Sequence, residues 1–308
     1  MLKALQALEK RMPRSHEKYS YIQNETYRSR AGYAGELEYD RYMKEVRTDY
    51  PHAILHDLYL QYEGVYFQID SLFITPDAVI ISEVKNLADK IIITANPTQF
   101  VKQSIDGKRK VFHSPIIEVE RKIHFLEKWL RHRGMQLEVR GIIVFSHINE
   151  MSIEAQPSLP IMTTYEAPAY FRSLIPSERR LDKKAIMKLA RNLTAAHRDY
   201  IPIALLTRYR MEKYEIRGGV FCVNCESPAV MEWRNLRWEC QACGTRDLHS
   251  HETAIEEWFM LMPEPLTNRA FCEFTGLTSR HTAKRMLVRS NIQKRGSGRG
   301  VNYSLLSK

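Results

Sequence analysis

Acidic and basic side chains stand inside an otherwise apolar stretch at residues 66–86, which reads YFQIDSLFITPDAVIISEVKN. Glu83 and Lys85 are two residues apart, so on a β-strand their side chains point to the same face. Burying such charges costs several kcal/mol unless something pairs them. The pattern therefore predicts a site in which Asp70, Glu83 and Lys85 share a partner.

The Thr-Pro-Asp sequence at residues 75–77 predicts a turn between two strands. A hairpin centred on Pro76 and Asp77 places Asp70 opposite Glu83, with Cβ atoms about 5 Å apart. Two carboxylates at that distance repel each other, and each favours its protonated form unless a cation lies between them. Asp77 lies more than about 10 Å along the strand from Glu83 and is assigned to the turn.

A divalent cation resolves this repulsion. Mg²⁺ and Mn²⁺ prefer oxygen ligands, which Asp70, Glu83 and the backbone carbonyl of Val84 can supply. Lys85 can orient or deprotonate an attacking water, while the metal stabilises charge on a scissile phosphate. The residues therefore predict phosphodiester hydrolysis, and a purely structural salt-bridge network is the alternative.

A fourth carboxylate, Glu36, opens a helix that we expect over residues 35–50, directly after the sequence AGYAG. The small residues allow this helix to approach the sheet closely, and Glu36 shares a partly apolar face with Tyr39 and Met43. Glu36 can then point toward the domain. An acid at a helix start is also favoured by the helix dipole alone, so both a functional and a structural role stay open.

The elements that must position these residues follow an α/β pattern. Apolar and β-branched segments predict strands, and apolar residues at helical spacing predict helices. The expected strands are 52–60, 65–75, 78–86, 90–94, 137–146 and 161–164, and the expected helices beyond the first are 116–133 and 182–198. Together they predict a mixed sheet flanked by helices.

The sequences AGYAGELEYDRYM, FQIDSLFITPDAVIISEVKN and IIVFS resemble the NERD (nuclease-related) domain of the PD-(D/E)xK nuclease superfamily. The resemblance covers residues 30–150. It implies a restriction-endonuclease-like fold, in which Glu36, Asp70, Glu83 and Lys85 match the catalytic positions of the family.

One motif departs from the family pattern. The family carries Asn-Pro-x-x-Gln at the start of the next helix, whereas residues 114–118 read SPIIE and place Glu118 where Gln would stand. Either Glu118 assists the metal, or the corresponding position lies elsewhere, with Gln103 as a substitute upstream.

Four of the five cysteines form two CxxC pairs, Cys222/Cys225 and Cys240/Cys243, separated by fourteen residues. Two such pairs complete a tetrahedral, all-thiolate Zn²⁺ site of the structural kind. The spacing predicts a zinc ribbon and argues against disulfides. His249 and His251 are expected at the surface.

Positive charge is concentrated at the C-terminal end, where residues 264–308 contain nine Lys and Arg against two Glu. A helix, a turn, a basic helix and a glycine-rich basic hairpin resemble a winged helix-turn-helix. Such a module binds DNA through its second helix and its wing. The expected DNA-binding residues are Arg280, Lys284, Arg285, Arg289, Lys294, Arg295 and Arg299. A basic surface with no ligand, or one that contacts proteins, is the alternative.

The 308 residues and net charge of +10 suit a nucleic-acid-binding protein of several domains. The sequence has neither a long apolar segment nor a secretory signal, so we expect a cytoplasmic protein with no membrane partner. We predict an N-terminal helical extension (1–29), a nuclease-like domain (30–215), a four-cysteine zinc ribbon (216–250) and a winged helix (251–308). The expected function is metal-dependent DNA hydrolysis. A catalytically inactive DNA-binding or regulatory protein and an RNA-processing nuclease are the alternatives.

Overall fold

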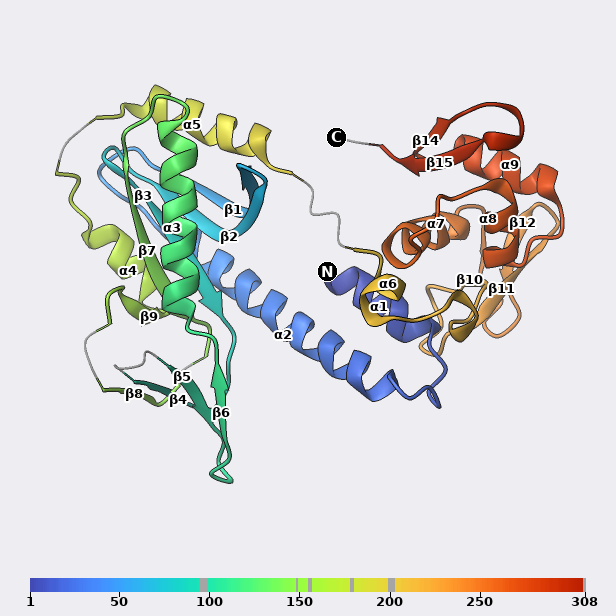
Figure 1. The fold of residues 1–308 in the computed structure, drawn as a ribbon, viewed down its shortest axis with the longest axis horizontal. Coiled ribbons are helices and arrows are strands. Elements are labelled where there is room, and N and C mark those ends of the chain that lie inside the picture. The colour runs from blue at the N-terminus through green and yellow to red at the C-terminus, as the bar shows by residue number, and fades with distance from the viewer. Residues whose placement is uncertain (95–98, 148, 155–156, 178–179, 199–202, 307–308) are drawn as a thin grey trace. The chain divides into compact units, whose positions relative to one another are not determined.

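The computed structural model describes residues 1–94, 99–147, 149–154, 157–177, 180–198 and 203–306 (Figure 1). The side chain of Arg299 lies outside the described part. The chain divides into two compact units. One contains Ala31–Tyr200, and the other combines Met1–Arg30 with Ile201–Lys308. The Ala31–Tyr200 unit has three hydrophobic clusters among its described residues, and the other unit has one. None of the helices in the described ranges has the length and apolarity that crossing a membrane requires.

A mixed five-stranded sheet forms the centre of the Ala31–Tyr200 unit, in the order β1-β2-β3-β7-β9. The first three strands are antiparallel, and β7 and β9 continue the sheet in parallel with β3. This arrangement confirms the predicted mixed α/β fold. The strands are β1 (Ala53–Tyr62), β2 (Val65–Ile74), β3 (Ala78–Lys85), β7 (Glu138–Phe145) and β9 (Ile161–Thr163).

Helices cover both faces of this sheet (Figure 1). On one face, α3 (Pro115–Arg131) and α5 (Lys183–Ala196) bury Leu126 and Leu189 against the sheet. On the other face, α4 (Ala167–Ser173) and the later residues of α2 (Tyr19–Met43) bury Phe171 and Tyr39. Because side chains alternate along a strand, odd-numbered residues of β3 face α3 and even-numbered ones face α2.

A second sheet has the order β6-β5-β4-β8; its first three strands lie between β3 and α3 in the chain, and β8 follows β7. Ile91, Phe100 and Ile116 join it to α3 through a separate apolar cluster. The sequence predicted only its first strand. Its strands are β4 (Lys90–Ile93), β5 (Phe100–Gln103), β6 (Arg109–Phe112) and β8 (Met151–Ile153).

The helix that carries Glu36 differs from its predicted extent of residues 35–50. It begins at Tyr19 and ends at Met43, so Gly35 lies inside it rather than at its start. The reason is a close approach: a Cβ atom at Gly35 would lie 2.7 Å from Cβ of Asn86 and 2.8 Å from Oγ of Ser146. Gly35 therefore lets the helix contact the sheet, as the small residues predicted.

One apolar cluster joins the N-terminal helix to the C-terminal part of the chain. Leu5 and Leu8 of α1 (Leu2–Arg11) pack there with Trp238 and Trp258. Helix α2 runs without a break across the predicted boundary at residue 29. The remaining elements of this unit are α6 (Leu205–Tyr209), η1 (Lys213–Glu215), β10 (Val220–Phe221), β11 (Val230–Arg234), β12 (Arg237–Cys240), β13 (Arg246–Asp247), α7 (Ser250–Leu261), α8 (Asn268–Thr275), α9 (Arg280–Arg289), β14 (Ile292–Arg295), η2 (Gly298–Gly300) and β15 (Asn302–Leu305).

Candidate active site

The predicted hairpin register is confirmed. Strand β2 pairs with β3 through Ser71↔Ser82 and Leu72↔Ile81, the register that brings Asp70 and Glu83 together. The ladder stops at Ser71↔Ser82. The next N–H of β3 that points toward β2 belongs to Val84, and it donates to Oδ2 of Asp70 over 2.9 Å. In a strand the N–H and C=O of one residue lie on the same edge, so β2 leaves the Val84 carbonyl unpaired as well.

Asp77 shapes the turn, as predicted. Oδ1 of Asp77 accepts a hydrogen bond of 2.8 Å from the hydroxyl of Thr75. Oδ2 accepts from the backbone N–H of Ser177 over 2.8 Å and from its hydroxyl over 3.1 Å. These bonds hold the pKa of Asp77 below its ordinary value, although burial alone would raise it. Both carboxylate oxygens are thus engaged at the turn.

Glu83 is buried at the end of β3, with 2 % of its surface exposed. Its Oε1 accepts a hydrogen bond of 2.6 Å from Nζ of Lys85. Its Oε2 accepts one from Nζ of Lys122, which lies on α3. Two ammonium groups therefore bond to one carboxylate, and the predicted pair of Glu83 and Lys85 does come together.

Lys122 is the residue that sequence reasoning missed. It is 5 % exposed, and Asp70, Glu83 and Glu118 raise its pKa although burial acts in the opposite direction. A signal was present, because Lys122 occupies an inward position of the apolar stripe of α3, three residues after Val119 and four before Leu126. A lysine at such a position requires a buried partner.

Glu118 also belongs to this cluster. Its carboxylate lies 3.0 Å from Nζ of Lys85 and 3.5 Å from Nζ of Lys122. The two lysines lower the pKa of Glu118, although burial acts to raise it. Burial would lower the pKa of Lys85, yet the neighbouring Glu83 and Glu118 raise it above its ordinary value. Lys85 is therefore a cation, which favours an orienting role over proton abstraction.

Glu36 lies on α2, half-buried, at the edge of the same cluster. Burial and the nearby Asp70 raise the pKa of Glu36 to about 7. Burial and Glu83 likewise raise the pKa of Asp70 to about 7. One turn further along α2, the hydroxyl of Tyr39 donates to Oγ of Ser82 over 2.7 Å and fixes the helix on β3.

The charges of this cluster would favour a bound cation. Glu36, Asp70, Glu83 and Glu118 carry four negative charges when ionised, against two positive charges on Lys85 and Lys122. Repulsion among these carboxylates contributes to the raised pKa values of Glu36 and Asp70. A divalent cation would reduce that repulsion. Asp70, Glu83 and the Val84 carbonyl are the hard oxygen ligands that Mg²⁺ and Mn²⁺ prefer.

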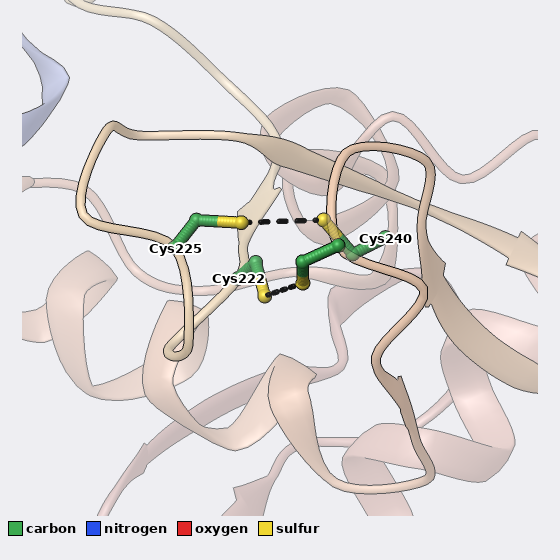
Figure 2. Close-up of side chains that lie close together, drawn as sticks. Cys222, Cys225 and Cys240 are labelled. Carbon is green, nitrogen blue, oxygen red and sulfur yellow. Dashed lines mark hydrogen bonds between the residues drawn. The ribbon is translucent and has the colours of Figure 1, made fainter.

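The four predicted zinc ligands converge in the other unit. The sulfur atoms of Cys222, Cys225, Cys240 and Cys243 all lie within 4.8 Å of one another. Cys222 and Cys243 are 3.6 Å apart, as are Cys225 and Cys240, and Figure 2 shows the contact between Cys225 and Cys240. Tetrahedral Zn–S bonds of about 2.3 Å separate the sulfurs by slightly more than this. The cluster can therefore hold Zn²⁺.

The surrounding hairpins position these cysteines. Cys222 follows β10 and Cys240 ends β12, within the four-stranded sheet β10-β11-β12-β13. Trp233 lies opposite Trp238 across the hairpin, as its sequence suggested. Hydrogen bonds from the Thr245 hydroxyl and amide lower the pKa of Cys243 and favour its thiolate.

The prediction for His251 is wrong. Rather than lying at the surface it is 6 % exposed, because its Nδ1 accepts a hydrogen bond of 3.2 Å from the indole of Trp238. Its ring also meets the edge of Phe271. His249, in contrast, is exposed, as expected.

The basic C-terminal residues lie on a helix pair followed by a hairpin. Ser279 caps α9 through a hydrogen bond to Thr282, and β14 pairs with β15. Tyr303 of β15 bridges to Leu266, which joins the hairpin to the start of the helix pair. The side chains of Arg280, Lys284, Arg285, Arg289, Lys294 and Arg295 are exposed, whereas that of the predicted Arg299 lies outside the described residues.

Comparison with known families gives a match inside the Ala31–Tyr200 unit. Residues 31–146 match the family model described as the nuclease-related domain, NERD. The match contains the β2–β3 hairpin and α3. It therefore includes every residue of the acid–lysine cluster, which consists of Glu36, Asp70, Glu83, Lys85, Glu118 and Lys122. No curated protein matches the chain, and neither does any solved structure.

Proposed function

We propose that the nuclease-related domain at residues 31–146 of this chain hydrolyses phosphodiester bonds of DNA with the help of Mg²⁺ or Mn²⁺. The observation that carries the proposal is the cluster at the end of β3, where Asp70 and Glu83 meet beside Lys85 and Lys122. Asp70, Glu83 and the Val84 carbonyl would hold the metal. The metal, when bound, would withdraw charge from the phosphate and ease ionisation of water.

Lys85 acts in this scheme as a fixed cation. Its ammonium lies at the outer side of the cluster, with 26 % of the side chain exposed, and it can donate to a phosphate oxygen. The raised pKa keeps this group protonated, so it does not take a proton from water. Glu36, half-buried on α2 beside Asp70, is the carboxylate that could accept that proton instead.

Lys122 acts as a positioning residue. Its side chain is 6 % exposed, too buried to reach a solvent-side phosphate, but it fixes the carboxylate of Glu83 from the side of α3. Glu118 lies 3.5 Å from Lys122 and 3.0 Å from Lys85, and so links the two lysines. In this arrangement Glu118 orients lysines and makes no contact with phosphate.

Cleavage assays on linear, circular and single-stranded DNA test the proposal. With Mg²⁺ or Mn²⁺ the protein should cleave, and chelation should stop it. Glu83→Ala and Lys85→Ala should each remove cleavage, whereas Asp77→Asn, at the turn, should retain it if the variant folds. Cleavage that survives both Glu83→Ala and Lys85→Ala would overturn the assignment.

The same assay separates the alternatives. In Glu83 both carboxylate oxygens are bonded to lysines, an arrangement that would also suit a catalytically inactive scaffold. DNA binding without cleavage at any metal concentration would favour that regulatory function. Matched RNA substrates decide the third possibility, because metal-assisted hydrolysis does not by itself distinguish the sugar.

The C-terminal unit would hold the enzyme on DNA. The exposed basic residues of α9 and of the β14–β15 hairpin support a winged helix-turn-helix, and the cysteine cluster supports a structural zinc ribbon beside it. Arg280→Ala and Lys284→Ala should each weaken DNA binding and flatten its dependence on salt. Arg269→Ala, an exposed residue of α8 paired with Glu273, is the matched control. Unchanged binding in fluorescence anisotropy would contradict this role.

A further inference from the structure

The small sheet carries an exposed basic hairpin formed by β5 and β6. Residues 99–113 contain four Lys and Arg against one acid, Asp106. The ladder pairs Phe100↔Phe112 through Gln103↔Arg109, and residues 105–111 are all exposed. We propose that the β5–β6 hairpin is a second nucleic-acid-binding element, which binds the phosphate backbone beside the active site.

The position of the hairpin follows from chain connectivity. Strand β4 begins five residues after Lys85, and α3 begins three residues after Phe112, where β6 ends. The hairpin therefore belongs to a chain segment inserted between β3 and α3, the elements that carry Glu83, Lys85, Glu118 and Lys122. Figure 1 shows it projecting from the end of the unit at which α3 begins.

The base of the hairpin is held firmly. Phe100 is 2 % exposed and its ring stacks on Phe145 of β7, with centroids 6.4 Å apart. Val101 is buried too, and the turn is closed by the Ser104 amide, which donates to the Lys108 carbonyl over 3.0 Å. A rigid base means that little conformational entropy would be lost when the hairpin contacts a ligand.

The charges of the hairpin are only partly neutralised. Asp106 accepts from the Ser104 hydroxyl and pairs with Lys108 at 2.7 Å, and Lys102 pairs with Asp89 at 3.0 Å. Among the described residues neither Arg109 nor Lys110 has an acidic partner. Lys110 also lies directly opposite Lys102, and like charges in that position destabilise a hairpin. An anionic ligand would relieve this repulsion.

A nucleic-acid backbone fits these observations better than a protein partner. Arg109 and Lys110 are consecutive on the outer strand of the sheet, so their side chains point to opposite faces and could contact phosphates on either side of the strand. The strand extends about 13 Å from its base to its tip, so the basic residues would meet phosphates flanking the scissile one. Their loss should therefore weaken binding and leave the chemical step intact.

The inference rests on the proposed function in taking nucleic acid as the substrate. The test compares Arg109→Ser/Lys110→Ser with Lys183→Ser/Lys184→Ser, which removes two exposed charges from α5 of the same unit. Both pairs are made in the full chain and in an Arg280→Ala/Lys284→Ala background, so that the C-terminal unit does not mask the effect. Binding to a labelled DNA duplex is measured by anisotropy at several salt concentrations without added Mg²⁺ or Mn²⁺.

We expect the hairpin variant to bind about tenfold more weakly, with the slope of log affinity against log salt reduced by about two. The α5 variant should keep the wild-type slope. An equal loss in both variants would show a general effect of net charge and overturn the proposal. Unchanged binding in the hairpin variant would overturn it too, and would leave the basic residues as protection of an exposed sheet edge.

Cleavage separates this proposal from the function it rests on. If the wild-type chain cleaves DNA, the hairpin variant should raise KM and keep kcat at saturating DNA. If the chain binds DNA through the hairpin but never cleaves it, the hairpin proposal stands and the nuclease proposal fails. If the hairpin variant cleaves DNA with an unaltered KM, the nuclease proposal stands and the hairpin proposal fails.

Discussion

Lys122 and Glu83 form an ion pair in which both side chains are almost completely buried, at 6 % and 3 % exposure. The pair joins α3 to β3. A buried charge without its partner is far more costly than the pair, whereas replacing both partners by neutral groups is often harmless. Lys122 therefore stabilises the domain only together with Glu83. The contribution of this pair to the free energy of unfolding can be measured separately from catalysis.

Lys122→Met should destabilise the domain by about 3 kcal/mol, because it leaves Glu83 buried with Lys85 as its main partner. The double variant Glu83→Gln/Lys122→Met should recover much of that loss. Lys128→Met, an exposed position on the same helix, should change stability by less than about 0.5 kcal/mol. Urea denaturation followed by circular dichroism measures all three. A double variant as unstable as Lys122→Met would contradict the pairing argument.

The pKa of Glu36 predicts a pH dependence of stability in metal-free protein. The folded chain raises this pKa from 4.5 to about 7, so between these values the folded state binds more protons than the unfolded state. Stability from this group is complete below about pH 4.5 and is lost as the pH rises through 7. Glu36→Gln should remove that part of the decline.

Melting temperatures measured across this pH range compare the wild type with Glu36→Gln and with Glu38→Gln. Glu38 lies on the same helix in a surface ion pair with Arg41, so its variant should follow the wild-type curve. Between about pH 4.5 and 7, we expect the melting temperature of Glu36→Gln to fall by a few degrees less than that of the wild type. Parallel curves for all three proteins would show that Glu36 keeps its ordinary titration.

The cysteine cluster predicts one zinc ion per chain. Cys222 and Cys240 belong to the apolar cluster that also contains Trp238, so removing the metal should loosen that core. Structural zinc contributes an apparent binding free energy on the order of 10 kcal/mol, and Cys240→Ser should therefore lose both zinc and folded structure in this unit. Elemental analysis and tryptophan fluorescence measure the two effects.

Cys272→Ser is the matched control, because Cys272 is partly buried but lies outside the cluster. It should retain stoichiometric zinc and a fluorescence spectrum like that of the wild type. A chain in which Cys240→Ser and Cys272→Ser hold equal zinc would not have the predicted site.

Local sequence information was sufficient for the hairpin and the cysteine cluster, but not for contacts made across the fold. Pro76 and Asp77 set the register of two adjacent strands, so the meeting of Asp70 with Glu83 could be predicted from residues close in sequence. Lys122 meets Glu83 only when α3 packs on the sheet, and they are 39 residues apart. No pattern within α3 names that partner.

Two further differences have the same origin. The helix expected to start at residue 35 begins at Tyr19, and Gly35 lies inside it although glycine disfavours helix interiors, because the contact with Asn86 and Ser146 requires it there. His251 was expected at the surface because four cysteines already complete a zinc site. It is buried instead and accepts a hydrogen bond from Trp238. In both cases a tertiary contact outweighs the local preference.

The N-terminal helix is an integral part of the C-terminal unit, because Arg11 is completely buried there. Its Nε donates to Glu257 of α7 over 2.8 Å, and Nη1 donates to the carbonyl of Arg217 over 2.9 Å. The guanidinium also lies 4.1 Å from the ring centroid of Phe274. Helix α1 thus supplies the counterion of a buried acid in a segment more than 240 residues away.

Arg11→Met should therefore destabilise the C-terminal unit by about 3 kcal/mol, although it keeps most of the apolar volume, because Glu257 would remain buried with only the more distant Lys10. Lys10→Met tests that remaining contact: its ammonium lies 3.6 Å from Glu257 and is partly exposed, so the loss should be below about 1 kcal/mol. Guanidinium denaturation followed by tryptophan fluorescence distinguishes the two variants. Equal losses would mean that α1 is held by its leucines alone, whereas recovery in Arg11→Met/Glu257→Gln would establish the buried pair as the link between the two ends of the chain.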